Sequence, residues 1–219
     1  MKRNLVLSAA LALAAAHPAA AQLRIPPVQL IAGVGEVGAT YYGAYHGGSA
    51  VYDLTHHAAR AWRLGLETPS PVRGVDLRLN LQRWSPRLTV SSITPGAAPV
   101  LPTGEIQRTT VTALTLDAVI RLPRVLESRP YVLLGTGLTR YDFNERYYQS
   151  AGQVALGDRT RPTAHLGLGT AWSVGRYDLF VEGSTFTTRL ERTTVDQRLD
   201  LHEGHNANFT VGVRIPLHR

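Results

Sequence analysis

The chain lacks cysteine altogether, and its only lysine is Lys2. Without cysteine it has no disulfide framework and no thiolate metal site. Past residue 21 no apolar run approaches the roughly 20 residues that a membrane-spanning helix needs. A mature chain embedded in a membrane must therefore cross it with strands.

The formal net charge of +7 comes almost wholly from arginine. The arginines are scattered singly, with no basic helix or cluster of the kind that nucleic-acid binding favours. We therefore expect no nucleic-acid partner. Arginine forks onto carboxylates and phosphates, so pairing inside a barrel or contact with phosphorylated lipid headgroups fits this spread better.

Residues 1–21 have the pattern of a secretory signal peptide. Lys2 and Arg3 form a charged start, residues 5–16 are apolar, and Ala19-Ala20-Ala21 offers a cleavage site before Gln22. We expect cleavage there, leaving residues 22–219 as one mature domain. No cysteine follows the site, so a lipoprotein is not expected.

From about residue 28 the hydrophobic period is two, which indicates strands. Trp62, Leu64 and Leu66 alternate with Arg63, Gly65 and Glu67. Similar alternation runs through residues 75–82, 113–120, 164–172, 177–184 and 208–217, while residues 28–38 and 131–141 are strand-like with ambiguous faces. We therefore predict an all-β, eight-stranded antiparallel up-and-down transmembrane β-barrel.

The connections between these strands alternate in length. Those at 68–73, 122–129 and 173–176 are short, and those at 39–58, 85–107, 144–161 and 189–205 are long. Outer-membrane barrels have short periplasmic turns and long extracellular loops. We therefore expect the protein in the outer membrane, with the long loops outside the cell.

The composition of the two faces predicts that the polar face lies inside. That face is rich in glycine, which suits a narrow eight-stranded interior, and its charges can pair across the lumen. We predict a structural charge network of Arg63, Glu67, Asp76, Arg78, Asp117, Glu182 and Arg214. On the apolar face Trp62, Trp172 and Tyr177 lie near strand ends, where interfacial aromatic residues sit. The inverse arrangement, a soluble lipocalin-like barrel, remains the alternative.

The mature chain resembles the small outer-membrane β-barrel family of OmpA-like and OmpX-like membrane domains. The resemblance rests on the leader, on the segments Leu134-Gly-Thr-Gly137 and Leu166-Gly-Leu-Gly169, and on the closing strand Phe209–Leu217. It implies a monomer, insertion by the barrel-assembly machinery, and contact with outer-membrane lipid and lipopolysaccharide. Such barrels usually end in an aromatic residue, whereas this chain ends Leu217-His218-Arg219. No peptidoglycan-binding domain follows the barrel, so the anchoring role of longer relatives is not implied.

Motifs with chemical meaning are few. Residues 33–38 match G-x-G-x-x-G, but no helical period follows, so we expect no dinucleotide cofactor. His46, His56 and His57, and the segment His202-Glu203-Gly204-His205, lack the spacing of a metal site. No histidine is followed by x-Ser, the pair found in lipid A deacylases, and no Gly-x-Ser-x-Gly segment occurs. We expect neither a metal nor catalytic residues.

These observations favour a non-enzymatic outer-membrane barrel with a structural or surface-interaction role through its long extracellular loops. Three alternatives stay open: a narrow channel for small or apolar solutes, a soluble lipocalin-like binder, and an envelope lipid-modifying enzyme. A channel requires a continuous lumen, and an enzyme requires clustered histidine, serine and carboxylates at the outer rim.

Overall fold

A computed structural model describes residues 27–47, 50–92, 104–142, 159–188, 199–201 and 204–217. The predicted signal peptide, the first two residues of the segment His202-Glu203-Gly204-His205, and the terminal His218-Arg219 lie outside these residues. Within them, no helix has the length and hydropathy that crossing a bilayer requires.

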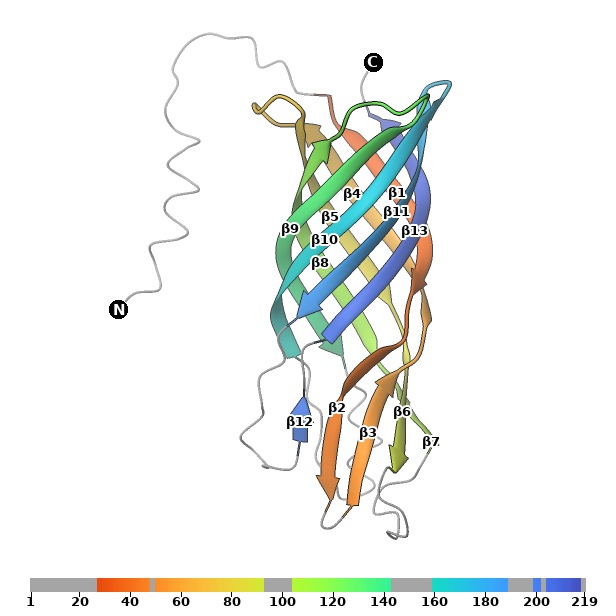
Figure 1. Cartoon of the computed structure of the whole chain (residues 1–219), viewed down its shortest axis with the longest axis vertical. Coiled ribbons are helices and arrows are strands. Elements are labelled where there is room, and N and C mark those ends of the chain that lie inside the picture. Colours follow the sequence, from red (N-terminus) through yellow and green to blue (C-terminus); the bar gives the residue numbers. More distant parts are fainter. Residues whose placement is uncertain are drawn as a thin grey trace, which may run out of the picture.

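Eight strands form a closed barrel, as predicted (Figure 1). Neighbouring strands pair antiparallel around the whole circle, and the first, β1, pairs with the last, β13, to close it. A closed barrel has no free edge, so every backbone polar group can be satisfied within a bilayer. The barrel strands are β1 (Gln29–Val37), β4 (Ala59–Pro69), β5 (Val75–Trp84), β8 (Thr110–Arg121), β9 (Arg129–Asp142), β10 (Arg159–Val174), β11 (Tyr177–Thr188) and β13 (Gly204–Pro216).

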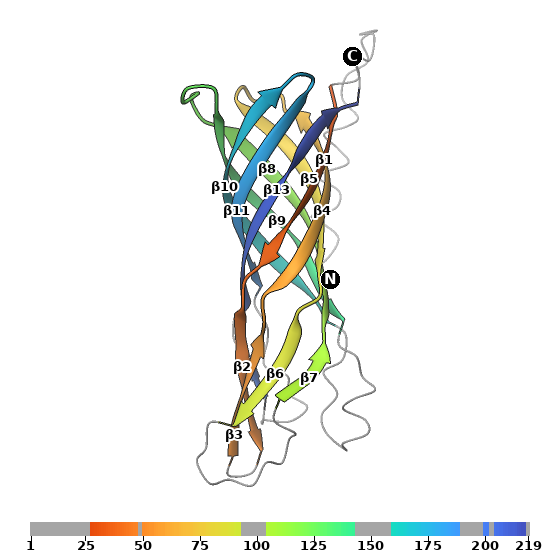
Figure 2. The same ribbon diagram turned by 90° about the vertical axis from the view of Figure 1, so that its right-hand side faces the viewer.

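The prediction that the long connections are loops is wrong for those at 39–58 and 85–107, while most of those at 144–161 and 189–205 lies outside the described residues. The long connections contain further strands. These are β2 (Thr40–Gly47), β3 (Ala50–His56), β6 (Arg87–Ser92), β7 (Gly104–Arg108) and β12 (Leu199–Leu201), which form a second sheet in the order β12-β2-β3-β6-β7. We call this sheet the extension. Figures 1 and 2 show it continuing from the rim opposite the short turns.

The extension is built by strands that leave the barrel and continue after short breaks. The adjacent barrel strands β1, β4, β5 and β8 continue as β2, β3, β6 and β7, in the same neighbour order. Backbone bonds span the breaks: Gly38 N–H donates to Ala207, His57 N–H to Arg87 and Thr109 N–H to Pro86. Four of the eight barrel strands therefore continue, after these breaks, into the extension.

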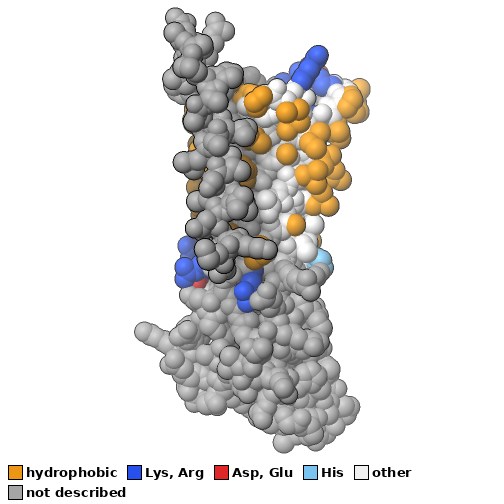
Figure 3. All heavy atoms as spheres, turned by 90° about the vertical axis from the view of Figure 1, so that its left-hand side faces the viewer, with side chains coloured by type: hydrophobic (Ala, Val, Ile, Leu, Met, Phe, Trp, Pro, Cys, Tyr) orange, Lys and Arg blue, Asp and Glu red, His pale blue; other side chains and the backbone are white. Residues whose placement is uncertain are grey.

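The predicted faces are confirmed, with the polar face inside. On β5, Asp76, Arg78, Asn80, Gln82 and Trp84 are buried, while Leu77 and Leu79 are exposed. The outer wall carries aliphatic side chains on every strand, and Leu168 is 65% exposed. Figure 3 shows this apolar band with basic side chains at both of its ends. Such a surface is stable only in hydrocarbon, which excludes the soluble lipocalin-like alternative.

In an outer-membrane barrel the short turns lie on the periplasmic side of the membrane, so the extension is expected on the extracellular side. Because the chain has no native cysteine, single cysteines can report which side each rim occupies. We expect His57→Cys, exposed beside the extension, to react with a membrane-impermeant maleimide on intact cells. The matched variant Arg73→Cys, exposed in a short turn, should react only after lysis. Labelling of the Arg73→Cys variant on intact cells would reverse the assigned orientation.

Candidate functional site: a sealed barrel interior

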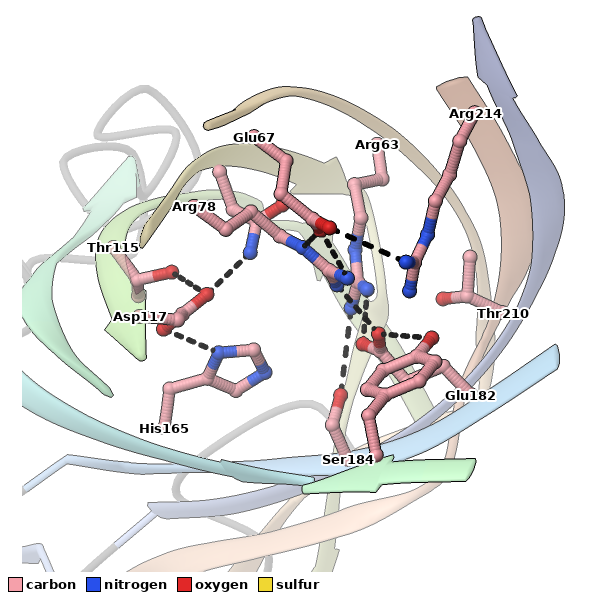
Figure 4. A network of polar contacts seen from close by, with 12 residues as sticks. Arg63, Glu67, Arg78, Thr115, Asp117, His165, Glu182, Ser184, Thr210 and Arg214 are labelled. Atoms are coloured by element: carbon pink, nitrogen blue, oxygen red, sulfur yellow. Dashed lines mark hydrogen bonds and ion pairs between the residues drawn. The ribbon is translucent and has the colours of Figure 1, made fainter. Parts of the chain in front are cut away.

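The centre of the barrel holds a cluster of ion pairs from strands that lie across the lumen from one another (Figure 4). Glu182 on β11 accepts from Arg63 on β4 and from Arg78 on β5, the latter at 2.7 Å. Glu67 on β4 accepts from Arg78 Nε at 2.8 Å and from Arg214 on β13 at 3.2 Å. We call Arg63, Glu67, Arg78, Glu182 and Arg214 the central cluster.

The central cluster is almost completely excluded from solvent. The side chains of Arg63, Arg78 and Glu182 are 1%, 0% and 0% exposed. A buried charge costs several kcal/mol unless it is paired, so the three arginines and two glutamates need one another. Strands must be closed in register before these partners meet, since Arg63 and Glu182 are 119 positions apart.

Polar and aromatic neighbours complete the central cluster. Gln82 accepts from Arg63 at 2.9 and 3.1 Å, and the Tyr131 hydroxyl donates to Glu182 at 3.1 Å. The Arg214 and Arg78 guanidinium groups lie 4.5 and 5.3 Å from the centre of the Tyr131 ring, within reach of cation–π attraction. Opposite this ring β10 has Gly169, where any Cβ would lie 2.3 Å from a Tyr131 ring carbon.

Asp117, predicted as part of one charge network, belongs to a separate group. It accepts from Asn80, from the Thr115 hydroxyl at 3.2 Å, and pairs with His165 Nδ1 at 2.9 Å. The His165 ring stacks on Phe186 with centroids 4.3 Å apart. Both partners of the Asp117–His165 pair are 0% exposed, so the pair lies within the barrel interior and not at an accessible rim.

Asp76 also lies apart from the central cluster. It points inward near the rim of the short turns and pairs with Arg121, which is 56% exposed. Among the predicted network residues, the structure therefore brings five together and places Asp76 and Asp117 in pairs of their own. The pairing changes because strand tilt offsets side chains that share the inner face.

The predicted interfacial aromatics divide between the two ends of the barrel. Trp62 on β4 is 41% exposed and lies toward the extension. Trp172 is 38% exposed and, with Tyr177, flanks the short turn between β10 and β11. The Arg176 guanidinium lies 4.8 Å from the centre of the Tyr177 ring. Aromatic residues at both ends match the two interfaces of a bilayer.

Apolar side chains pack beside the charges in the interior. A buried cluster consists of Ile31, Val119, Tyr131, Leu133, Ala171 and Phe180, and its Tyr131 contacts the central cluster. Toward the extension, Trp84 stacks with Phe186 at 5.8 Å between centroids, and both are at most 2% exposed. Nearby, His56 ends β3; burial, with a smaller contribution from repulsion by His57, lowers its pKa to about 3, so it is neutral at pH 7.

Several interior residues were missed in the sequence. Tyr131 was missed because the faces of residues 131–141 are ambiguous there. His165 was missed because it is not followed by x-Ser and lies outside the histidine groups that were weighed as metal ligands. The inward parity of Asn80, Gln82 and Asn208 was a usable signal, since polar residues on the inner face need partners. Asn208 donates to Ser184 at 3.2 Å and to Gln82 at 3.3 Å.

No described group of three or more histidine, aspartate or glutamate side chains is placed to hold a metal ion. The G-x-G-x-x-G match at 33–38 lies on and just after β1 and leads into strand β2. It lacks the helix that a dinucleotide site requires.

No protein-family model and no curated protein matches the sequence. Its structure is similar to that of the outer membrane protein OprG from Pseudomonas aeruginosa, with a TM-score of 0.59 and 11% identity over 89% of this chain and 97% of that one. It is also similar to Neisserial surface protein A, with a TM-score of 0.55 and 10% identity over 86% of this chain and 96% of that one. At these identities the likeness is one of fold. By this fold and its apolar outer belt, the chain is an eight-stranded outer-membrane β-barrel.

Proposed function

We propose that the protein is a non-enzymatic, non-conducting barrel that anchors the extension at the cell surface for interaction with the surroundings. The observation that carries the proposal is the sealed interior: the central cluster fills the lumen with side chains that are almost fully buried. The barrel wall in turn continues directly into the extension. Such an arrangement suits a rigid support for a surface sheet.

The channel alternative is disfavoured because a solute would have to separate buried ion pairs. Removing one partner of such a pair costs several kcal/mol, far above thermal energy. The interior therefore offers no continuous polar path at the level of Glu182 and Arg78.

The enzyme alternative is disfavoured by the position of the Asp117–His165 pair. A hydrolase needs a nucleophile within hydrogen-bond reach of the base. The free ring nitrogen of His165, Nε2, has no hydrogen-bond partner within the described part of the chain. The pair is also closed off from substrate by Phe186, which stacks on the imidazole.

Electrical recording from planar bilayers tests the proposal. We expect the purified, refolded protein to produce no single-channel steps, because the central cluster closes the lumen. A wide porin in the same membrane serves as the positive control. Reproducible steps from the unboiled, folded species would contradict the proposal and support the channel.

A further inference from the structure

The turn between β8 and β9 exposes apolar side chains at the end of the barrel opposite the extension (Figure 2). Every residue from 121 to 127 is exposed to solvent. Leu126 is 96% exposed and Val125 is 60% exposed, and we call these two residues the tip. Because the tip lies beyond Arg121, the last residue of β8, it does not belong to the membrane-facing wall.

The backbone of Leu126 has a conformation that normally requires glycine. Val125 and Ser128 exchange two backbone hydrogen bonds, of 3.2 and 3.1 Å, so Leu126 is the first residue of a two-residue hairpin loop. Its φ is 55°, and no other non-glycine residue in the described part of the chain has a positive φ. The other two short turns have glycine at this kind of position, Gly74 and Gly175. An exposed leucine here stabilises neither the turn nor the interior, and such an outlier points to function.

Local hydrogen bonds hold the tip in place. The Ser128 hydroxyl donates to the Val125 carbonyl at 2.8 Å. At the base of the turn, Leu122 N–H donates to the Pro130 carbonyl at 2.9 Å, which continues the pairing of β8 with β9. A side chain on an ordered turn loses little conformational entropy when a partner binds. The tip therefore presents Leu126 in a conformation ready for burial against another molecule.

Basic side chains accompany the tip. The turn at 70–74 lies alongside, since its last carbonyl accepts from Arg121 N–H at 2.9 Å. Each of the two turns carries one exposed arginine, Arg73 and Arg124. No ion pair joins either arginine to another residue among those that the structure describes, and Glu127 is the only carboxylate of the two turns. An apolar tip with neighbouring arginines complements an apolar pocket bordered by carboxylates.

We propose that the tip is a docking site for a periplasmic protein, with an apolar pocket that receives Leu126 and carboxylates that border this pocket. The short turns face the periplasm in an outer-membrane barrel. A projecting leucine fits a concave apolar pocket of the kind that protein surfaces form, and guanidinium groups bind carboxylates in a forked geometry. Glu127, next to Leu126, disfavours insertion of the tip into the inner leaflet, because a carboxylate is costly in hydrocarbon. This contact is separate from the interaction proposed for the extension.

Photo-crosslinking in intact cells tests the docking site. With benzoylphenylalanine in place of Glu127 in the full chain, we expect one predominant adduct with a periplasmic protein, which mass spectrometry identifies. The same label in place of Val174, an exposed apolar residue beside another short turn, should not give this adduct. The proposal is overturned by the absence of an adduct at position 127, by the same adduct from position 174, or by an adduct that muramidase removes and that is therefore peptidoglycan.

Binding of the identified protein, once purified, to the full barrel in detergent measures the contribution of the tip. We expect Leu126→Gly to weaken this binding about tenfold or more. Glycine suits the φ of 55°, so this variant should fold at least as stably as the wild type, as heat-dependent gel mobility can show. Arg124→Gln should also weaken binding, whereas Val174→Ala, the matched control, should not. Equal affinity of the Leu126→Gly variant and the wild type would overturn the proposal.

A fluorescent label separates docking on a protein from insertion into lipid. Leu126→Cys gives the chain its only cysteine, which can carry an environment-sensitive dye in barrels refolded into phosphatidylethanolamine–phosphatidylglycerol vesicles. We expect the emission of a water-exposed dye in the vesicles alone. A blue-shifted emission in the vesicles alone would mean that the tip lies in lipid, and the proposal would fail.

Discussion

Replacement of Glu182 by glutamine is expected to destabilise the barrel by about 3–5 kcal/mol, the cost of leaving a buried partner unpaired. Glu182 is the carboxylate shared by Arg63 and Arg78. These side chains are buried, so water cannot take the place of the lost carboxylate. After the substitution Arg78 still contacts Glu67, but Arg63 retains only neutral partners. The measurement is denaturant-induced unfolding in lipid vesicles, followed by tryptophan fluorescence.

Two further variants make this result specific. Asp142→Asn removes the partner of Arg140 in an exposed pair, where the expected cost is below about 1 kcal/mol. Arg63→Met combined with Glu182→Gln should recover part of the loss, because the unpaired cation is then gone. If Glu182→Gln is as stable as the wild type, the central cluster is not what holds the strands together.

Replacement of Gly35 by alanine is expected to prevent stable closure of the barrel. Gly35 lies on β1 at its pairing with β13, and an added Cβ would lie 2.0 Å from the carbonyl oxygen of Phe209. A backbone atom cannot move aside as a side chain can, so the cost should exceed the roughly 1–3 kcal/mol of an overpacked core. We expect loss of the band whose gel mobility shifts on boiling.

Gly38→Ala is the matched control for this prediction. Gly38 directly follows β1, and its N–H donates to Ala207 on β13. A Cβ added at Gly38 would lie 3.6 Å from the nearest atom, which is an ordinary contact. This variant should keep the wild-type mobility shift. A Gly35→Ala protein that folds with the same stability as Gly38→Ala would show that β1 and β13 can move apart at this position without cost, and would contradict the prediction.

The strands of the extension could not be predicted from the alternation of apolar and polar side chains. Residues 40–56 mix glycine, alanine, tyrosine and aspartate without a two-faced pattern, although β2 and β3 are paired there. Outside the membrane no hydrocarbon requires an apolar face, so the period of two is not imposed on the sequence. The strands instead follow from the pairing of the barrel strands that precede and follow them.

The sequence by itself determined the eight membrane strands, the face of each well-patterned strand, and the inward position of the charges. Hydrocarbon outside and a narrow lumen inside impose opposite compositions on alternate residues, and that pattern is local. Only the tertiary structure decided which charges meet. Arg63 with Glu182, Asp117 with His165, and Asp76 with Arg121 are contacts between strands distant in sequence. Their geometry depends on the tilt and closure of the whole barrel, which no single strand encodes.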